Sequence, residues 1–163
     1  MATNKPKKLA LKRRRSKGWW TSIEPNNPMT KVVLDTNVLI SGFNFPVSKP
    51  ARILELVAAG EFTNFISEPI IEESAPILTA KFSWSLPEVE AAAFWLKTFS
   101  HLVTPKTHLT VIIDEPDNRI LECAVTGKVD FITTGDKHLL KLKAYRGIEI
   151  VKPADFLEIF SVR

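Results

Sequence analysis

The sequence predicts an α/β fold of three layers, α/β/α, in which a central, mostly parallel sheet of about five strands lies between helices. Short runs of β-branched and other apolar residues alternate repeatedly with segments of helical periodicity. This alternation is typical of βαβ units, whose crossover helices cover both faces of a parallel sheet. With 163 residues, of which 45% are hydrophobic, the chain has the length of one domain and enough apolar residues for its core.

Each expected strand is a short apolar run bounded by turn-forming or capping residues. The first is Val32, Val33 and Leu34, a run that suits a parallel strand buried on both faces. The run at 111–113 fits the edge of a loop as well as a strand. The other expected strands span 62–66, 131–134 and 148–151.

The expected helices are identified by their apolar spacing and by the residues at their ends. Ser85 and Glu88 form a capping box with a proline in the first turn. Asp114 can cap a helix that Gly127 closes. Residues 41–48 contain glycine, proline and two serines, so they are predicted to form a loop. The expected helices span 51–58, 68–78, 86–96, 115–124, 137–143 and 153–160.

The net charge of +4 divides into two unlike parts. Residues 1–28 carry a net charge of +7 and are predicted to form a disordered basic arm, whereas 29–163 carry −3 and are predicted to form the folded domain. The basic cluster from Lys12 to Arg15 suits an electrostatic contact with nucleic acid or a targeting signal. The alternatives are a solvated tail without a role and a true start at Met29.

Several classes of site and location are not expected from this composition. The single cysteine, Cys123, excludes an internal disulfide and a CxxC site. The three histidines, His101, His108 and His138, lack the spacing of a zinc site. No long uncharged stretch predicts a transmembrane helix, and no apolar segment follows the basic start as it would in a secretory signal. We therefore expect a cytoplasmic protein without a membrane contact.

Carboxylates follow the expected strands at their carboxyl ends. Asp35 ends the first strand, and Asp136 lies just past the fourth. Asp114, Asp117 and Glu73 lie in the first turns of helices that follow strands. Because ligands of open α/β sheets bind outside the carboxyl ends of the strands, we expect these acids to converge. Like charges packed so closely need cations, and all-oxygen sites favour Mg²⁺ or Mn²⁺.

Taken singly, each acid also has a purely structural interpretation. Asp35 can close a turn with its own backbone, and Asp114 can cap a helix. Asp117 can complement the helix dipole in the same first turn. Glu72 and Glu73 are adjacent and point to different faces of one helix, so one of them is expected at the surface. The joint placement of the acids is the stronger argument for a shared site.

Four segments, in order, resemble the motifs of PIN-domain proteins. They are 33–41 with Asp-Thr-Asn, 67–78 with Glu-Glu, 114–124 with Asp-Glu-Pro-Asp-Asn, and 130–140 with Thr-Thr-Gly-Asp-Lys-His. The closing segment, 147–157, is similar to the version found in toxin components of bacterial toxin–antitoxin systems. The resemblance covers about residues 31–160 and implies a PIN-like form of the predicted fold. Ser74 and Pro76 depart from the second motif, which makes it the least secure of the four.

The resemblance implies a Mg²⁺- or Mn²⁺-dependent endoribonuclease. Glu72 remains the alternative to Glu73 because the register of the second motif is ambiguous by one residue. The residues that match the acidic quartet, as catalytic residues and metal ligands, are Asp35, Glu73, Asp117 and Asp136. Asp114 matches an additional metal-binding acid. Asn37, Asn118 and Thr134 are candidates for orienting carboxylates or water around the metal.

The expected partners are RNA as substrate, a cognate antitoxin protein, and a second copy of the chain in a homodimer or higher oligomer. Trp84, Phe94, Trp95 and Phe99 lie in or beside one expected helix, and they suit a core or a dimer surface. One alternative function is a catalytically silent PIN-fold module that binds nucleic acid or protein. Another is an aspartate-nucleophile phosphatase, although position 37 is Asn where that chemistry usually has an acid.

Overall fold

The structure, a computed structural model, describes residues 29–160, and the arm predicted over 1–28 lies outside them. Its centre is a six-stranded sheet in the order β3-β2-β1-β4-β6-β5. All neighbouring strands are parallel except β5 and β6, which are antiparallel. The predicted α/β class with a mostly parallel sheet is therefore confirmed. The strands are β1 (Lys31–Leu34), β2 (Thr63–Ile66), β3 (Ser100–Leu102), β4 (Phe131–Thr133), β5 (Ala144–Tyr145) and β6 (Ile148–Val151).

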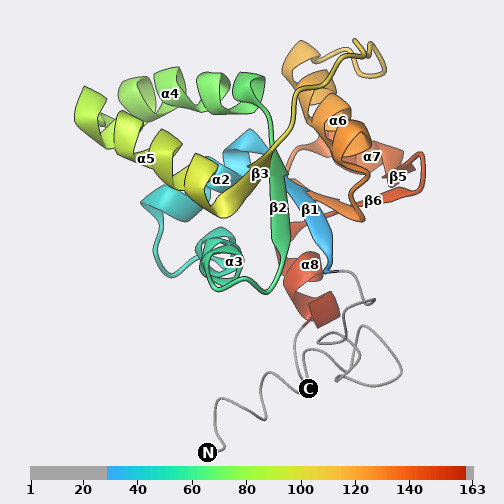
Figure 1. Cartoon of the computed structure of the whole chain (residues 1–163), viewed down its shortest axis with the longest axis horizontal. Coiled ribbons are helices and arrows are strands. Elements are labelled where there is room, and N and C mark those ends of the chain that lie inside the picture. The colour runs from blue at the N-terminus through green and yellow to red at the C-terminus, as the bar shows by residue number, and fades with distance from the viewer. Residues whose placement is uncertain (1–28, 161–163) are drawn as a thin grey trace, which may run out of the picture.

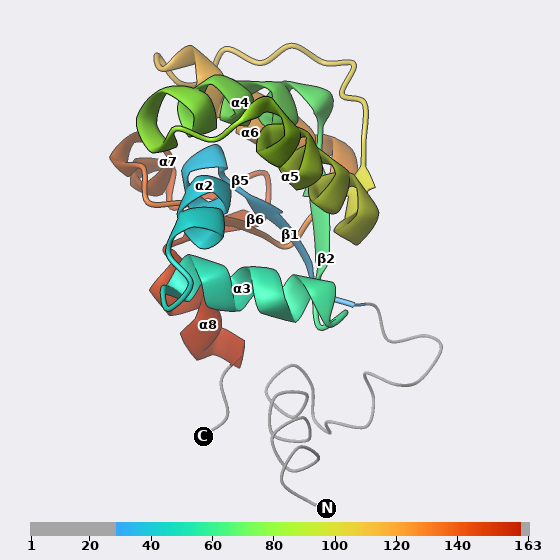
Figure 2. The same ribbon diagram turned by 90° about the vertical axis from the view of Figure 1, so that its left-hand side faces the viewer.

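Helices cover the sheet on both sides. Figure 1 shows α6 and α7 on one side of the strands, with α2, α3 and α5 on the other. Figure 2, turned by 90°, shows α3 and α8 next to each other below α2. In the described part of the chain, no helix is long and apolar enough to cross a membrane. The helices are α2 (Thr36–Asn44), α3 (Lys49–Ala58), α4 (Glu68–Phe82), α5 (Leu86–Phe99), α6 (Glu115–Gly127), α7 (Lys137–Leu142) and α8 (Pro153–Phe160).

The core lies along the two central strands. Val32, Val33 and Ile132 are completely buried, because β1 and β4 have neighbours on both edges and helices on both faces. A cluster of phenylalanines joins α8 to the sheet, with ring centroids 4.8 Å apart between Phe62 and Phe156. This packing fixes the central strands, and with them the residues at their carboxyl ends.

Two helices continue through residues that suggested an interruption. The loop predicted over 41–48 is wrong in its first half, because α2 runs to Asn44. Gly42 serves close packing there: a Cβ atom at this position would lie 2.4 Å from Cδ1 of a leucine in α3. Helix α4 likewise continues through Ser74 and Pro76. The Ser74 hydroxyl is buried and donates a 2.6 Å hydrogen bond to a carbonyl one turn earlier.

Two strands were not expected, and one segment that suited either a strand or a loop edge is a loop. Residues 111–113 form part of a loop, and the third strand is instead β3 at 100–102. Two of the three residues of β3 are exposed, so it shows no apolar run, and its pairing with β2 at the sheet edge defines it. The two-residue strand β5 was also missed, because it is too short for any periodicity to appear.

Candidate functional site

Parallel pairing of β1 with β4 places the ends of these strands side by side. Leu34 is in register with Thr133, so the next residues along each strand, Asp35 and Thr134, are neighbours. The Thr134 hydroxyl donates a 2.6 Å hydrogen bond to Asp35 Oδ2 and accepts one of 2.9 Å from the Asp136 backbone N–H. Thr134 therefore links the Asp35 carboxylate to the start of α7.

Asp35 is a buried carboxylate that begins α2 without capping it through its side chain. Only 4% of its surface is exposed. Burial raises the pKa of Asp35 to about 6, against the hydrogen bonds from Thr134 and the Thr36 backbone, and the carboxylates of Glu73 and Asp136 raise it further. Ionising Asp35 is therefore more costly here than in water, and a nearby cation would lower that cost.

Asp117 is the second buried acid, and it lies in the first turn of α6. Within residues 29–160, its Oδ2 atom has no hydrogen-bond partner. Burial, followed by the carboxylates of Asp136, Asp35 and Asp114, raises the pKa of Asp117 to about 7. A buried carboxylate oxygen without a partner is costly, which makes it an available ligand for a cation.

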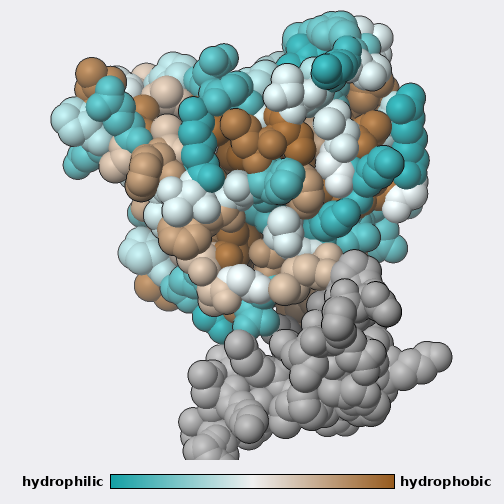
Figure 3. Space-filling model, in the orientation of Figure 1, coloured by the Kyte–Doolittle hydropathy of each residue, from teal (hydrophilic) through white to brown (hydrophobic). Residues whose placement is uncertain are grey.

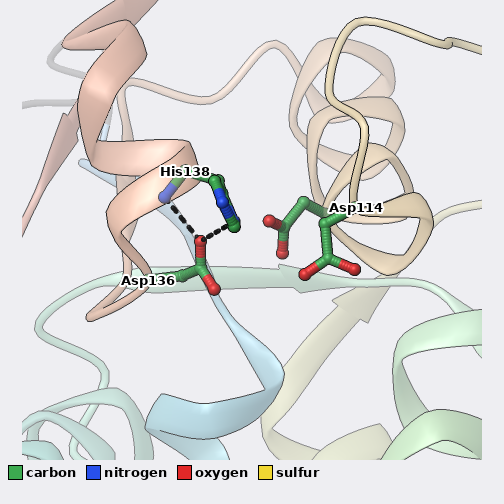
Figure 4. A group of neighbouring side chains, drawn as sticks. Asp114, Asp136 and His138 are labelled. Carbon is green, nitrogen blue, oxygen red and sulfur yellow. Dashed lines mark hydrogen bonds and ion pairs between the residues drawn. The ribbon is translucent and has the colours of Figure 1, made fainter.

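Asp114, Asp117, Asp136 and His138 bring one ligand atom each to within 4.8 Å of one another. Figure 4 shows Asp136 and His138, at the start of α7, facing Asp114 across the site. The Asp136 carboxylate caps α7 by accepting a 2.7 Å hydrogen bond from the His138 backbone N–H. Its Oδ1 also lies 3.5 Å from His138 Nδ1. These four residues therefore come from the starts of α6 and α7.

Glu73 enters the site from α4. The Thr36 hydroxyl, one residue after Asp35, donates a 3.0 Å hydrogen bond to Glu73 Oε1. Glu73 is also one of the charges that raise the pKa of Asp35. The neighbouring Glu72 is exposed on another face of the helix. The geometry thus favours Glu73 over Glu72 as the acid of this segment.

The model of the PIN domain family matches residues 31–138, two-thirds of the chain. The chain belongs to the PIN-domain family. Members of this family are generally nucleases, and the matched segment contains Asp35, Glu73, Asp114, Asp117 and Asp136.

Two further comparisons extend the family match. The uncharacterized protein MJ1680 of Methanocaldococcus jannaschii is 31% identical over 143 residues, which cover 80% of this chain and 92% of that protein. The crystal structure of VapBC2 from Rickettsia felis, bound to a DNA fragment from their promoter, matches with a TM-score of 0.53 and 17% identity. That match covers 74% of this chain and 97% of the other. At this identity the likeness supports the PIN fold alone.

The structure places the three expected orienting residues differently within the PIN domain. Thr134 contacts the Asp35 carboxylate directly. Asn37 is exposed on α2. Asn118 is buried, and its side-chain amide bonds the backbone of 111–112 and the Glu115 carboxylate rather than an acid of the site.

Two residues near the acids were not predicted for the site. Thr36 orients Glu73, and its position directly after Asp35 in the first motif was the available signal. His138 lacks the spacing of a zinc site, and it is half exposed, but its ring lies beside Asp136. The available signal was the position of Asp136 as a candidate N-cap, since a capping side chain bonds the backbone N–H two or three residues later.

The donor set fits a hard divalent cation. It consists of carboxylate oxygens with one imidazole at the edge, which is the ligand chemistry of Mg²⁺ or Mn²⁺. The partnerless Asp117 oxygen and the raised pKa values of Asp35 and Asp117 are what a site that lacks its cation should show. The residues present therefore suit the metal that PIN nucleases typically use.

Proposed function

We propose that this PIN-domain protein is a Mg²⁺- or Mn²⁺-dependent endoribonuclease. The observation that carries the proposal is the convergence of two buried carboxylates, Asp35 and Asp117, whose pKa values lie near neutrality and one of which has an oxygen without a partner. This arrangement is unfavourable without a cation and is well suited to bind one. The acidic quartet assigned to the metal and to catalysis is Asp35, Glu73, Asp117 and Asp136, with Asp114 as an additional ligand.

When bound, the divalent ion supplies Lewis acidity at the phosphate oxygens and a water molecule of lowered pKa. The chain's own residues position these groups. Thr134 fixes the orientation of Asp35, and Thr36 fixes that of Glu73. The α7 backbone holds Asp136 through its cap. Because these contacts exist before any substrate arrives, the ligands are pre-organised. Water attacking the phosphorus would expel the 3′ oxygen, so we expect products with 5′-phosphate and 3′-hydroxyl ends.

The proposal is tested by cleavage of a mixed RNA pool with Mg²⁺ or Mn²⁺ and, separately, with EDTA, using the full chain purified free of host nuclease. Asp35→Asn should abolish cleavage and leave the fold intact. A matched pair on α4, Glu73→Gln and Glu72→Gln, tests the second motif, because only Glu73 contacts Thr36. Full activity of Asp35→Asn would refute the assignment.

Two other functions are decided by the same preparation. A silent PIN-fold binding module would bind RNA without metal-dependent cleavage. An aspartate-nucleophile phosphatase would release phosphate from a small ester and leave RNA intact. The sequence contains all four acids of the quartet, which favours the nuclease over the silent module, since a silent module would tolerate their loss.

We also propose an antitoxin partner and self-association. The support is the resemblance of 147–157 to toxin components, together with exposed apolar side chains where α4 and α5 meet (Figure 3). Leu86 and Phe94 of α5 are 69% and 74% exposed, while Trp95 is partly buried against the core. Light scattering on the full chain, alone and co-expressed with the product of a small neighbouring gene, tests both associations. A monomer that captures no such product would contradict them.

A further inference from the structure

A groove of about 580 Å³ continues from the acidic site between the loop at 111–114 and α7. Asp114 and His138 line this groove and also belong to the acidic cluster. The groove is therefore one end of the same depression, and its volume is within the range of roughly 300–1,000 Å³ that ligand clefts occupy. The other residues that line the groove have no role in the proposed metal site or in the proposed reaction.

One wall of the groove is apolar and exposed. Ile113 is completely exposed and Val111 is 42% exposed, although both are large aliphatic residues. Both line the groove beside the acids. Apolar side chains gathered at a functional cleft commonly contact a ligand.

The loop that carries this wall is fixed in place by Asn118. The Asn118 Oδ1 atom accepts hydrogen bonds of 2.8 and 2.9 Å from the backbone N–H groups of Val111 and Ile112, and its Nδ2 donates one of 2.7 Å to the Ile112 carbonyl. Only 1% of Asn118 is exposed. The loop has no secondary structure, but these bonds tie its backbone at 111–112 to α6.

The opposite wall of the groove carries a positive charge. Lys141 of α7 is exposed and lines the groove. In the described part of the chain it forms no ion pair. A lysine without an acidic partner, beside an apolar wall, is complementary to a phosphate attached to a base.

We propose that this groove binds the nucleotide next to the RNA bond that is cleaved, with Ile113 and Val111 against the base and Lys141 against a phosphate. The inference rests on the proposed ribonuclease function and adds the residues that hold the substrate. An RNA strand whose phosphodiester lies at the acids must continue along the surface, and the groove opens directly from them. Contact between an apolar wall and a base face requires an unpaired base, since paired bases are stacked within the helix.

The test measures binding of a short, single-stranded, fluorescent oligoribonucleotide of mixed sequence to the full chain in Mg²⁺. All proteins carry Asp35→Asn, so that the probe stays intact, and the basic arm is the same in each. Ile113→Ala and Lys141→Ala are compared with Val47→Ala and Lys49→Ala. The control residues are an exposed aliphatic and an exposed lysine at the distant α2–α3 junction.

Ile113→Ala and Lys141→Ala should each raise Kd about fivefold to tenfold, while the controls stay within about twofold. Lys141→Ala should also reduce the slope of log Kd against log salt by about 0.7, the value for one phosphate contact on a single strand. Ile113→Ala should leave that slope unchanged. Unchanged affinity in both groove variants would overturn the proposal.

Cleavage by the groove variants with Asp35 intact separates this inference from the function on which it rests. If the wild type cleaves RNA and Ile113→Ala and Lys141→Ala cleave it equally well, the proposed role of the groove is overturned while the proposed nuclease function stands. If the wild-type protein cleaves no RNA but both groove variants bind the oligoribonucleotide more weakly than it does, the proposed nuclease function is refuted and the groove is supported as an RNA-binding site. A raised KM in both variants, with metal affinity unchanged, is the result expected.

Discussion

Asp117→Asn should stabilise the metal-free protein at pH 8 while it abolishes cleavage. Asp117 is 6% exposed, and one of its oxygens lacks a partner among the described residues. Burial and the charge of Asp136 raise the pKa of Asp117 to about 7, from an ordinary value of 3.8. The asparagine has nearly the same shape but no charge, and its amide can donate to the neighbouring carboxylate.

The sign follows from proton linkage. A carboxyl group whose pKa is higher in the folded state binds its proton more tightly there, so stability falls as pH rises from about 4 through about 7. A difference of about 3 pH units corresponds to about 4 kcal/mol when the group is fully ionised. Part of this cost is repulsion that Asp117 shares with Asp35 and Asp136. Removing the charge of Asp117 should therefore raise the free energy of unfolding by about 2–4 kcal/mol. For a domain of this size that is roughly 5–15 °C in Tm.

The assay is thermal unfolding of the wild type and Asp117→Asn in EDTA, at pH 5 and pH 8. The advantage of the variant should grow from pH 5 to pH 8, because the cost of ionising Asp117 develops over this interval. Added Mg²⁺ or Mn²⁺ should raise the wild-type Tm and narrow the gap, since metal binds the ionised carboxylates. Glu72→Gln, an exposed acid on α4, is the control and should change the stability little at either pH.

The reasoning is refuted if Asp117→Asn is no more stable than the wild type at pH 8 in EDTA. A gain of equal size at both pH values would also refute it, because the effect would then come from packing rather than from charge. Both results would mean that Asp117 is not the buried, repelled carboxylate described above.

Three other changes give separate tests. Glu73→Gln should lower the cleavage rate at least about a hundredfold on a mapped RNA substrate, whereas Glu72→Gln should retain it. Asn118→Ala should cost about 1–3 kcal/mol in urea unfolding, and hydrogen exchange at 111–112 should accelerate, because those backbone groups lose their buried partner. Gly42→Ala should lower the free energy of unfolding by about 1–3 kcal/mol, since its Cβ would lie 2.4 Å from a leucine of α3. An unchanged midpoint of urea unfolding would mean that α2 and α3 can move apart at no cost.

The convergence of the acids was predictable because it depends on local patterns. A buried apolar run followed by Asp35, and a second followed by Asp136, predict two strand ends, and parallel pairing places such ends at one edge. Of the residues that orient the acids, Thr134 was expected from the sequence and Thr36 was not. Thr134 and Thr36 act through contacts across the sheet and between helices, and Asn118 acts on a loop rather than on the site.

The errors concern segments whose tertiary contacts outweigh their local sequence. The strand β3 has one half-buried and two exposed residues, so only its edge pairing with β2 identifies it. Residues 111–113 are the opposite case, an apolar run that is not a strand. Apolar β-branched residues usually indicate burial in a sheet, but Ile113 is fully exposed beside the acids. Of the two interpretations of 111–113, the loop is the one the structure shows, and it is the segment for which we propose a substrate contact.

The cost of the two buried carboxylates also bears on the choice between an enzyme and a silent binding module. A protein that kept this fold only to bind a partner would be more stable with an amide at position 117, by the few kcal/mol derived above. Burial around β1 opposes the ionisation of Asp35, although the hydrogen bond from Thr134 favours the carboxylate form. Natural domains have only about 5–15 kcal/mol of net stability, so a loss of this size is substantial. A cation that neutralises both acids removes the loss and gives them a chemical use, which is why the geometry favours the metal-dependent nuclease.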